Sequence, residues 1–237
     1  MTKECRFEYP VRLRAEHCDP NRKLRLQSLL HFSQEMCIHH TELLGMGRKM
    51  TLDKGFLWII NKERFEITRL PEYDEEITLV TYPGEMLHYF FPRYFRILDK
   101  SGTVIVKGSI LWSLIDKKTR QLIDPIEHGI HIQGQEKPDQ LPLMFSTRHP
   151  DLQARDTITA TFDRCDLNGH LNNASYLDIA LEHMPLAVLK EKAIHTIDMS
   201  FAKEIPLGES FELTYGSSDN AYYFTSDDFF IRMTYGD

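Results

Sequence analysis

The sequence predicts an α+β fold built from two related halves, each with a curved antiparallel sheet wrapped around one long helix. Two observations support this prediction. The segment Val11 to Leu29 aligns with the segment Ile158 to Tyr176 without gaps, and both contain the pattern Cys-Asp-x-Asn-x-x-Leu. In each half, a strand-like stretch precedes a helical pattern, and several strand-like stretches follow it. Two such halves can bury their helices side by side.

The two helices are predicted from the spacing of apolar residues. In the first half, the residues from Leu26 to Leu44 place a set of apolar side chains on one helical face, and Gly45 is expected to end the helix. In the second half, the pattern runs from Ala174 to Met184 and then meets Pro185. Because proline disrupts the interior of a helix, we expect a kink or a new helix there.

Strand-like stretches follow each helix. The first half contains them at 56–67, 76–82, 87–98 and 104–115, and the second half at 194–203, 210–215, 222–225 and 229–235. A polar, proline-bearing segment separates the halves and is expected to be a linker. The predicted organisation is an N-terminal domain over 1–124, a linker over 125–155 and a C-terminal domain over 156–237.

The two halves differ at positions where catalysis would need titratable groups. His170 in the second half corresponds to Lys23 in the first. When RFEITRLP (64–71) is aligned with MSFAKEIP (199–206), Glu204 corresponds to Arg69. A duplicated enzyme that kept one working site would lose such groups from the idle copy while keeping its packing residues. The second half is therefore the candidate for the site.

Polar residues gather between a strand and a helix in the second half, at Asp166, Asn168, His170, Asn172 and Asn173. Ordinary structural roles account for some of them, because asparagine commonly caps helices and aspartate commonly closes Asx turns. The imidazole in the same turn favours a catalytic function, since His170 can move a proton or donate to a developing oxyanion. The helix N-terminus adds backbone donors and a positive dipole end.

A carboxylate for this cluster is expected from Glu204, which lies on the next strand just before Pro206. The alternative for Glu204 is a solvated residue at the end of a strand, as most glutamates are. The adjacent His39 and His40 point to different faces of a helix and are expected to be surface residues rather than metal ligands. Cys18 and Cys165 occupy the same repeat position and are expected to be small packing residues within strands.

Composition limits the function further. The formal net charge is -7, and no stretch concentrates lysine and arginine, so nucleic acid is a poor candidate partner. No apolar run approaches the length of a membrane helix, which is about 20 residues. The first residues lack an export signal, so we expect a cytoplasmic protein. The four cysteines have neither metal-site nor disulfide-scaffold spacing, so we expect reduced thiols and no structural zinc site. The sequence indicates no metal and no organic cofactor.

Four segments resemble the acyl-acyl carrier protein thioesterase family. The stretch DLNGHLNN (166–173) is similar to the family motif Asp-x-Asn-x-His-x-Asn-Asn. Three further stretches resemble family segments in the same order and spacing: LWIINKERFEI (57–67), LWSLIDKKTRQL (111–122) and FAKEI (201–205). The resemblance covers nearly the whole chain. It implies a tandem double hotdog fold, with an acyl-chain tunnel lined by the first half.

The resemblance also implies an activity, which is hydrolysis of the thioester between a fatty acyl group and the phosphopantetheine of acyl carrier protein. Carried over residue by residue, the implied catalytic group is Asp166, Asn168, His170 and Glu204. Plant members have cysteine after that glutamate, whereas this chain has Ile205. We therefore expect attack by water, assisted by Glu204 and His170, without a covalent acyl-enzyme.

Three other functions on this fold remain open from the sequence. The first is hydrolysis of acyl-CoA by the same cluster, and the second is dehydration of a 3-hydroxyacyl thioester. The third is non-catalytic acyl binding, which needs none of the four polar residues. A basic patch for an acidic carrier is expected at 117–120 or at 22–25, although either can be a solvated turn. A monomer and a homodimer are both compatible with two fused halves.

Overall fold

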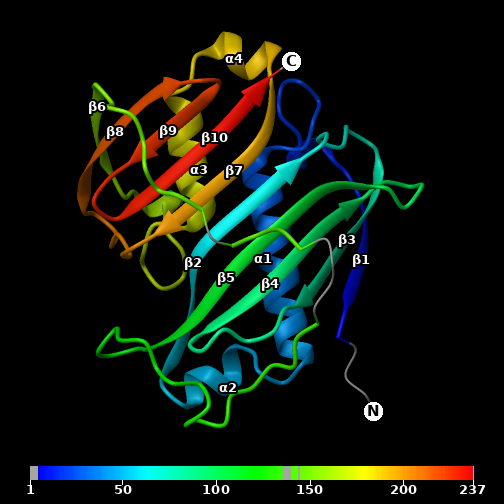
Figure 1. Ribbon diagram of the computed structural model, residues 1–237, viewed down its shortest axis with the longest axis vertical. Helices are drawn as coiled ribbons and strands as arrows, with labels where there is room; N and C mark the ends of the chain where they lie inside the picture. The colour runs from blue at the N-terminus through cyan, green and yellow to red at the C-terminus, as the bar shows by residue number, and fades with distance from the viewer. Residues whose placement is uncertain (1–4, 136–139, 144, 237) are drawn as a thin grey trace.

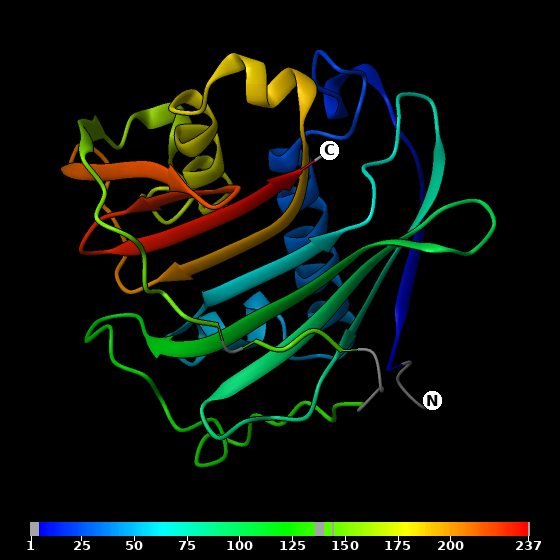
Figure 2. The same cartoon turned by 45° about the horizontal axis from the view of Figure 1, so that its top comes forward.

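The chain folds into one ten-stranded antiparallel sheet that curves around two long helices (Figures 1 and 2). The computed structural model describes residues 5–135, 140–143 and 145–236. The strand order is β1-β3-β4-β5-β2-β7-β10-β9-β8-β6. Strands β6 to β10 of the second half take the same relative order as β1 to β5 of the first, but run across the sheet in the opposite direction. This arrangement confirms the prediction of two related halves.

Each half contributes a strand, a short 3-10 turn, a long helix, a short helix and four strands. The first half contains β1 (Phe7–Arg12), η1 (Ala15–His17), α1 (Leu26–Leu43), α2 (Arg48–Asp53), β2 (Phe56–Ile67), β3 (Glu76–Pro83), β4 (Phe90–Leu98) and β5 (Val104–Asp116). The second contains β6 (Ala154–Thr159), η2 (Phe162–Arg164), α3 (Asn173–Glu182), α4 (Leu186–Glu191), β7 (Ala193–Phe201), β8 (Ser210–Ser218), β9 (Ala221–Thr225) and β10 (Phe229–Gly236).

The halves join along a single pair of strands, β2 and β7. These strands are antiparallel, with Lys62 opposite Ser200 and Glu66 opposite Thr196. Helices α1 and α3 lie side by side on the same face of the sheet (Figures 1 and 2). A hydrogen bond from Gln27 of α1 to Asp178 of α3 links them. The pairing of β2 with β7 therefore joins the strands of both halves into one sheet and brings both helices into one layer.

Hydrogen bonds in the loops repeat between the halves and correct one sequence correspondence. Leu24 N–H donates to the carbonyl of Pro71, at 2.9 Å, and Leu171 N–H donates to that of Ile205, at 2.8 Å. Ile205 thus corresponds to Pro71, so Glu204 corresponds to Leu70, and the expected match to Arg69 was wrong. Aligning the two prolines misled the comparison, because Pro206 lies one position further along its turn than Pro71 does.

The predicted helix ends are confirmed. Gly45 has a φ of 79°, and its N–H donates to the carbonyl of Glu42 while Met46 N–H donates to that of Thr41. This is the Schellman arrangement, in which glycine avoids the steric cost of a positive φ. In the second half, Pro185 separates α3 from a new helix, α4, and stands at the N-cap of the latter.

Two predicted strands are shorter than expected. β4 begins at Phe90 rather than at 87, because Leu87 and Phe90 close a tight turn in which His88 has a φ of 58°. β7 ends at Phe201 rather than at 203, because the N–H groups of the next two residues both donate to the carbonyl of Asp228. The short helix α2 was not predicted, since six residues are too few for a clear period.

Two hydrophobic clusters fill the interior. The larger one spans both halves and contains Leu29 and Phe65 from the first half with Leu177 and Ile231 from the second. The smaller one contains Phe56, Phe91, Trp112 and Leu114 from the first half and Ile132 from the predicted linker. The first cluster ties the halves together, whereas the second lines a part of the first half that also contains open space, as described below.

Several side chains depart from their expected environments. His40 is buried, with 1% of its surface exposed, so the expectation of two surface histidines was wrong for this residue. Helix α1 turns His40 toward β4, where its Nδ1 lies 2.8 Å from Arg93. Cys18 and Cys165 follow the short 3-10 turns η1 and η2 rather than lying within strands. All four cysteines are free thiols. No helix in the described part of the chain could cross a membrane.

Candidate active site

The predicted polar cluster forms a tight turn that leads into α3. Asp166 closes this turn, because its Oδ1 accepts hydrogen bonds from the backbone N–H groups of Asn168, at 2.8 Å, and His170, at 3.2 Å. The side-chain amide of Asn168 donates to Asp166 Oδ2 at 3.3 Å. Gly169 takes a φ of 79°, which a side chain would disfavour. Asp166 therefore forms an Asx turn and also orients the carboxamide of Asn168.

Asn172 has the structural role that the sequence allowed. It is the N-cap of α3, and its side-chain oxygen accepts a hydrogen bond from Ala174 N–H at 2.9 Å. Asn173, the first residue of the helix, lines the cavity described below. Asn172 lines the same cavity, so the two adjacent asparagines differ in the cap that Asn172 alone provides.

Replacing Asn172 by alanine is expected to lower the free energy of unfolding by about 1 kcal/mol, because the helix loses its side-chain cap. Chemical denaturation monitored by circular dichroism measures this loss. Asn173→Ala is the matched control, since its side chain caps nothing, and a change within about 0.5 kcal/mol is expected for it. Equal losses in the two variants would contradict the assigned cap.

The side chains of His170 and Glu204 meet at the start of α3. His170 Nδ1 lies 3.7 Å from Glu204 Oε1, which is longer than a direct hydrogen bond. The other carboxylate oxygen, Glu204 Oε2, forms an ion pair with Arg120. Arg120 belongs to the turn after β5 and comes from the first half of the chain. The carboxylate of the second half is thus held by a cation of the first.

Burial and charge set the state of His170. Its imidazole is 22% exposed, and Nδ1 has no hydrogen-bond partner among the described residues. Burial lowers the pKa of His170, the nearby Arg120 lowers it further, and Asp166 acts in the opposite direction. A pKa below the usual value favours the neutral imidazole at neutral pH, which is the form that can accept a proton.

Arg120 is held in place by a rigid turn. Asp116 Oδ1 accepts backbone hydrogen bonds from Lys118, at 2.9 Å, and Thr119, at 2.7 Å, and these bonds lower the pKa of Asp116. Arg120 itself has a φ of 58°, an uncommon conformation for a residue with a side chain. The turn therefore fixes the point from which the guanidinium reaches Glu204. Sequence reasoning placed Arg120 in a basic surface patch and missed this contact.

Few backbone donors remain available at the N-terminus of α3. The N–H groups of Leu171 and Asn172 donate to backbone carbonyls, and those of Ala174 and Ser175 donate to Asn172. Within the described part of the chain, the N–H of Asn173 has no acceptor. The expected oxyanion donors at this helix end therefore reduce to one backbone N–H, beside the side chains of Asn168 and His170.

A cavity of about 640 Å³ connects this cluster to the interior of the first half. At one end it is lined by Asp166, Asn168, His170, Asn173, Arg120 and Glu204. The remaining lining comes largely from the first half, mainly from α1, α2 and β2, and includes the aromatic side chains of Phe56, Trp58, Phe91 and Trp112. A polar, titratable end thus opens into a mostly apolar interior, as ligand sites commonly do.

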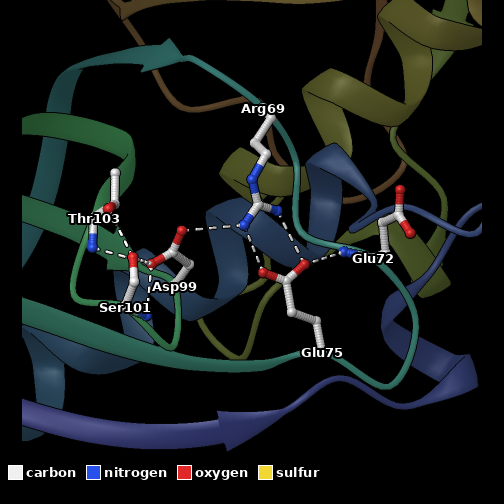
Figure 3. Close-up of polar contacts among 6 residues, drawn as sticks. All are labelled: Arg69, Glu72, Glu75, Asp99, Ser101 and Thr103. Atoms are coloured by element: carbon white, nitrogen blue, oxygen red, sulfur yellow. Dashed lines mark hydrogen bonds and ion pairs between the residues drawn. The ribbon is translucent and has the colours of Figure 1, made fainter.

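The corresponding corner of the first half contains a different set of side chains. Lys23 replaces His170, and Leu70 replaces Glu204 and packs against the hydrophobic core. The neighbouring Arg69 is neutralised by Glu75, with a nitrogen to oxygen distance of 2.7 Å, and by Asp99 at 3.4 Å (Figure 3). This corner therefore holds a structural ion-pair cluster and has no imidazole or carboxylate in the positions of the candidate site.

No cysteine is placed to act as the nucleophile. Ile205 is buried at 3% exposure, at the position where the family resemblance implies a cysteine in plant members. Burial raises the pKa of Cys165, and the neighbouring Asp166 and Asp163 raise it further, so the thiol stays protonated at neutral pH. Among the described residues, no group of three or more metal-ligating side chains comes together.

Comparison with solved structures identifies the fold. Its structure superposes on a crystal structure of an acyl-ACP thioesterase from Bacteroides thetaiotaomicron with a TM-score of 0.80, over 100% of both chains at 20% identity. It also superposes on a 12:0-ACP thioesterase from Umbellularia californica with a TM-score of 0.82, over 98% of each chain at 16% identity. The predicted double hotdog fold is therefore confirmed.

Family comparisons identify the chain more narrowly. The acyl-ACP thioesterase N-terminal domain matches residues 4–130, and the acyl-ACP thioesterase C-terminal domain matches residues 149–233. The chain therefore belongs to the acyl-ACP thioesterase family. A chloroplastic acyl-[acyl-carrier-protein] hydrolase of Cuphea viscosissima is 23% identical over 84% of this chain. The chain spans about half the length of the curated relatives that it matches, and 52% of this one.

Proposed function

We propose that this protein hydrolyses the thioester of fatty acyl-acyl carrier protein and releases the free fatty acid. The observation that carries the proposal is the cavity that joins His170 and Glu204 to an apolar interior. A thioester at the polar end would place its acyl chain among the aromatic side chains of the first half. The two domains expected at 1–124 and 156–237 would then divide the work, since one binds the chain and the other carries the chemistry.

The proposed reaction begins with water between Glu204 and the thioester carbonyl. Glu204 accepts a proton from the water, whose oxygen forms a bond to the carbonyl carbon. The tetrahedral intermediate then collapses, the carbon to sulfur bond breaks, and the sulfur leaves as a thiolate. His170, close to Glu204, carries the proton to the sulfur. No acyl-enzyme forms, in agreement with the buried Ile205 at the position of the plant cysteine.

The carbonyl oxygen becomes negatively charged during this reaction and needs hydrogen-bond donors. The unused N–H of Asn173 lies at the positive end of the α3 dipole and lines the cavity, so we assign the oxyanion to it. Asn168 adds a carboxamide held by Asp166. Under this proposal Asp166 acts by positioning, while Asn168, His170 and Glu204 contact the reacting atoms or the water.

The proposed carrier surface is the turn at the cavity mouth rather than the turn at 22–25. Lys117 and Lys118 are exposed beside Arg120, and Lys203 is 75% exposed next to Glu204. Leu167, which is 72% exposed in the catalytic turn, adds an apolar contact. An acidic carrier approaching these lysines would bring its thioester to the mouth. Arg22 and Lys23 do not line the cavity.

Replacing Lys117 and Lys118 together by glutamate is expected to raise KM for acyl-acyl carrier protein about tenfold or more at low salt, because the acidic carrier loses its attraction to the mouth. Steady-state kinetics measure this change. KM for the same acyl group on uncharged pantetheine should stay the same, since only the carrier is charged. The control variant reverses Arg22 and Lys23, and an equal effect there would move the surface to the other turn.

The experiment that tests the function measures free thiol released from a chain-length series of acyl groups, each presented on acyl carrier protein and on coenzyme A. His170→Ala is run beside the parent protein. Faster, His170-dependent release from the carrier protein supports the proposal and gives the preferred chain length. A preference for coenzyme A would favour an acyl-CoA thioesterase, and no release from either would favour a dehydratase or an acyl-binding protein.

Location and assembly are part of the same proposal. An acyl-acyl carrier protein thioesterase acting in fatty acid synthesis would work in the cytoplasm of a bacterial cell, as the sequence led us to expect. The fused halves already bury the helix layer, which is compatible with a monomer. A homodimer would have to form elsewhere, and the sheet has open edges at β1 and β6. Size-exclusion chromatography with light scattering distinguishes the two.

A further inference from the structure

A buried guanidinium forms part of the cavity wall away from the catalytic cluster. Arg93, on β4, is 3% exposed and lines the cavity together with Cys37 and Thr41 of α1. Its Nη1 lies 2.8 Å from His40 Nδ1, and its Nη2 donates to the carbonyl of Cys37 at 3.1 Å and to the hydroxyl of Thr41. None of these partners is a carboxylate.

Arg93 forms no ion pair with any carboxylate in the described ranges 5–135, 140–143 and 145–236. Burial lowers the pKa of Arg93, whereas the neighbouring Cys37 acts in the opposite direction. A guanidinium keeps its proton even when buried. Burying such a charge without a carboxylate partner is costly, and the cavity wall therefore carries a positive charge that no carboxylate among the described residues pairs with.

The nearest buried acid in the sheet does not neutralise Arg93. Glu63 on β2 and Arg93 on β4 are both opposite Ile110 on β5, so one strand separates them by about 10 Å across the sheet. Glu63 is fully buried, accepts a hydrogen bond from Gln34 at 3.4 Å, and has its pKa raised by burial to about 8. It is therefore mostly protonated and uncharged at neutral pH.

The end of helix α1 compensates the charge only in part. Cys37 and Thr41 lie in the last two turns of α1, whose C-terminal end carries a partial negative charge of roughly half an elementary charge. This dipole and the hydrogen bonds explain why Arg93 can be buried at all. They leave room for an anion on the cavity side of the guanidinium.

The position of Arg93 along the cavity follows from the two elements that flank it. On α1, the lining residues run from His31 to Thr41, and ten residues of helix rise by about 15 Å. On β5, Ile110 opposite Arg93 lies six residues before Asp116, whose turn carries Arg120, and six strand residues span about 20 Å. Arg93 therefore lies roughly 15 to 20 Å from the catalytic end.

The cavity thus has three parts, namely a catalytic end, an apolar middle and a buried cation at the far end. We infer that it accepts acyl groups whose distal end carries a carboxylate, with Arg93 binding that carboxylate. The planar guanidinium suits a carboxylate because both present paired hydrogen-bonding groups. This inference rests on the proposed thioesterase activity and specifies its substrate class as ω-carboxyacyl thioesters of a length that spans the cavity.

The test compares acyl thioesters of equal length that end in either a methyl group or a carboxylate. For the parent protein, kcat/KM is expected to be about tenfold or more higher for the carboxylate-ended member of the best pair, as a buried charged hydrogen bond allows. In Arg93→Met this preference should disappear, with the methyl-ended substrate hydrolysed as well as before or better. Arg96→Met, on the same strand but not lining the cavity, should keep the preference of the parent.

A binding measurement on the parent protein keeps the inference testable if Arg93→Met fails to fold or if no thioester is hydrolysed. Isothermal titration with a dicarboxylic acid and the monocarboxylic acid of equal length is expected to show about tenfold tighter binding of the former. Tighter binding without hydrolysis would support the anion site while rejecting the thioesterase activity. Equal or weaker binding of the dicarboxylic acid at every length, or a parent preference for methyl-ended substrates, would overturn the inference.

Discussion

The Glu204→Gln protein is expected to release thiol at least about a hundredfold more slowly than the parent at saturating substrate. Glutamine keeps the size of the side chain and can still accept a hydrogen bond from Arg120, but it cannot take a proton from water. The loss should therefore appear in kcat, while KM should change little because the proposed acyl-chain site lies elsewhere in the cavity. Steady-state thiol-release assays with an acyl group of the preferred length measure both kcat and KM.

The control for this variant is Glu209→Gln. Glu209 is exposed and lies five residues further along the chain, outside the cavity, so its neutralisation should leave kcat unchanged. Thermal denaturation of both variants checks that neither has unfolded. A Glu204→Gln protein with near-normal kcat would remove Glu204 from the role of base and leave His170 as the remaining candidate.

Arg120→Gln is expected to lower kcat about tenfold or more and to shift the pH dependence of the reaction. The ion pair fixes the direction of the Glu204 carboxylate, and misplacing a catalytic group by a small distance is costly. Arg120→Lys should recover part of the activity, because it restores the charge without the planar contact. Lys118→Gln, in the same turn but without an ion pair to Glu204, serves as the control for kcat; because Lys118 belongs to the proposed carrier surface, only its KM for acyl-acyl carrier protein is expected to change.

The direction of the pH shift follows from the charges around His170, which are Arg120, Asp166 and Glu204. Arg120 lowers the pKa of His170, so its removal should raise that pKa. If the reaction needs the neutral imidazole, activity falls as the pH drops through this pKa, and the acidic limb of the kcat profile should move to higher pH in Arg120→Gln. An unmoved or oppositely moved limb would contradict the proposed electrostatic contact.

Local sequence patterns predicted most of the fold, because the information lies in neighbouring residues. The helical period from Leu26, the stop at Gly45 and the restart at Pro185 are all properties of a few adjacent positions. The internal repeat predicted the long-range arrangement of the two halves, since the match between Asp19 and Asp166 implied two copies of one topology. The unpredicted α2 and the shortened β4 depend on loop geometry, which short patterns do not specify.

The candidate site was predicted in part. The turn from Asp166 to His170 is local, so its residues could be read from a single motif. The contact between Arg120 and Glu204 could not, because it depends on how the turn after β5 approaches the other half. The buried Arg93 was missed for a similar reason. A charged residue between Pro92 and Tyr94 on a strand gives no sign that it faces an interior cavity rather than water.

The ion pair between Arg120 and Glu204 has an evolutionary consequence. In a dimer of identical chains, a substitution in one corner would also occur in the other, because one gene encodes both. In two fused copies the corners can differ, and this chain has Lys23 and Leu70 in the first half where the second half has His170 and Glu204. The Arg120 ion pair couples the copies instead, since a side chain of the first half holds the Glu204 carboxylate of the second. Recombination that exchanges one half between distant relatives would therefore have to preserve this charge pair across the junction.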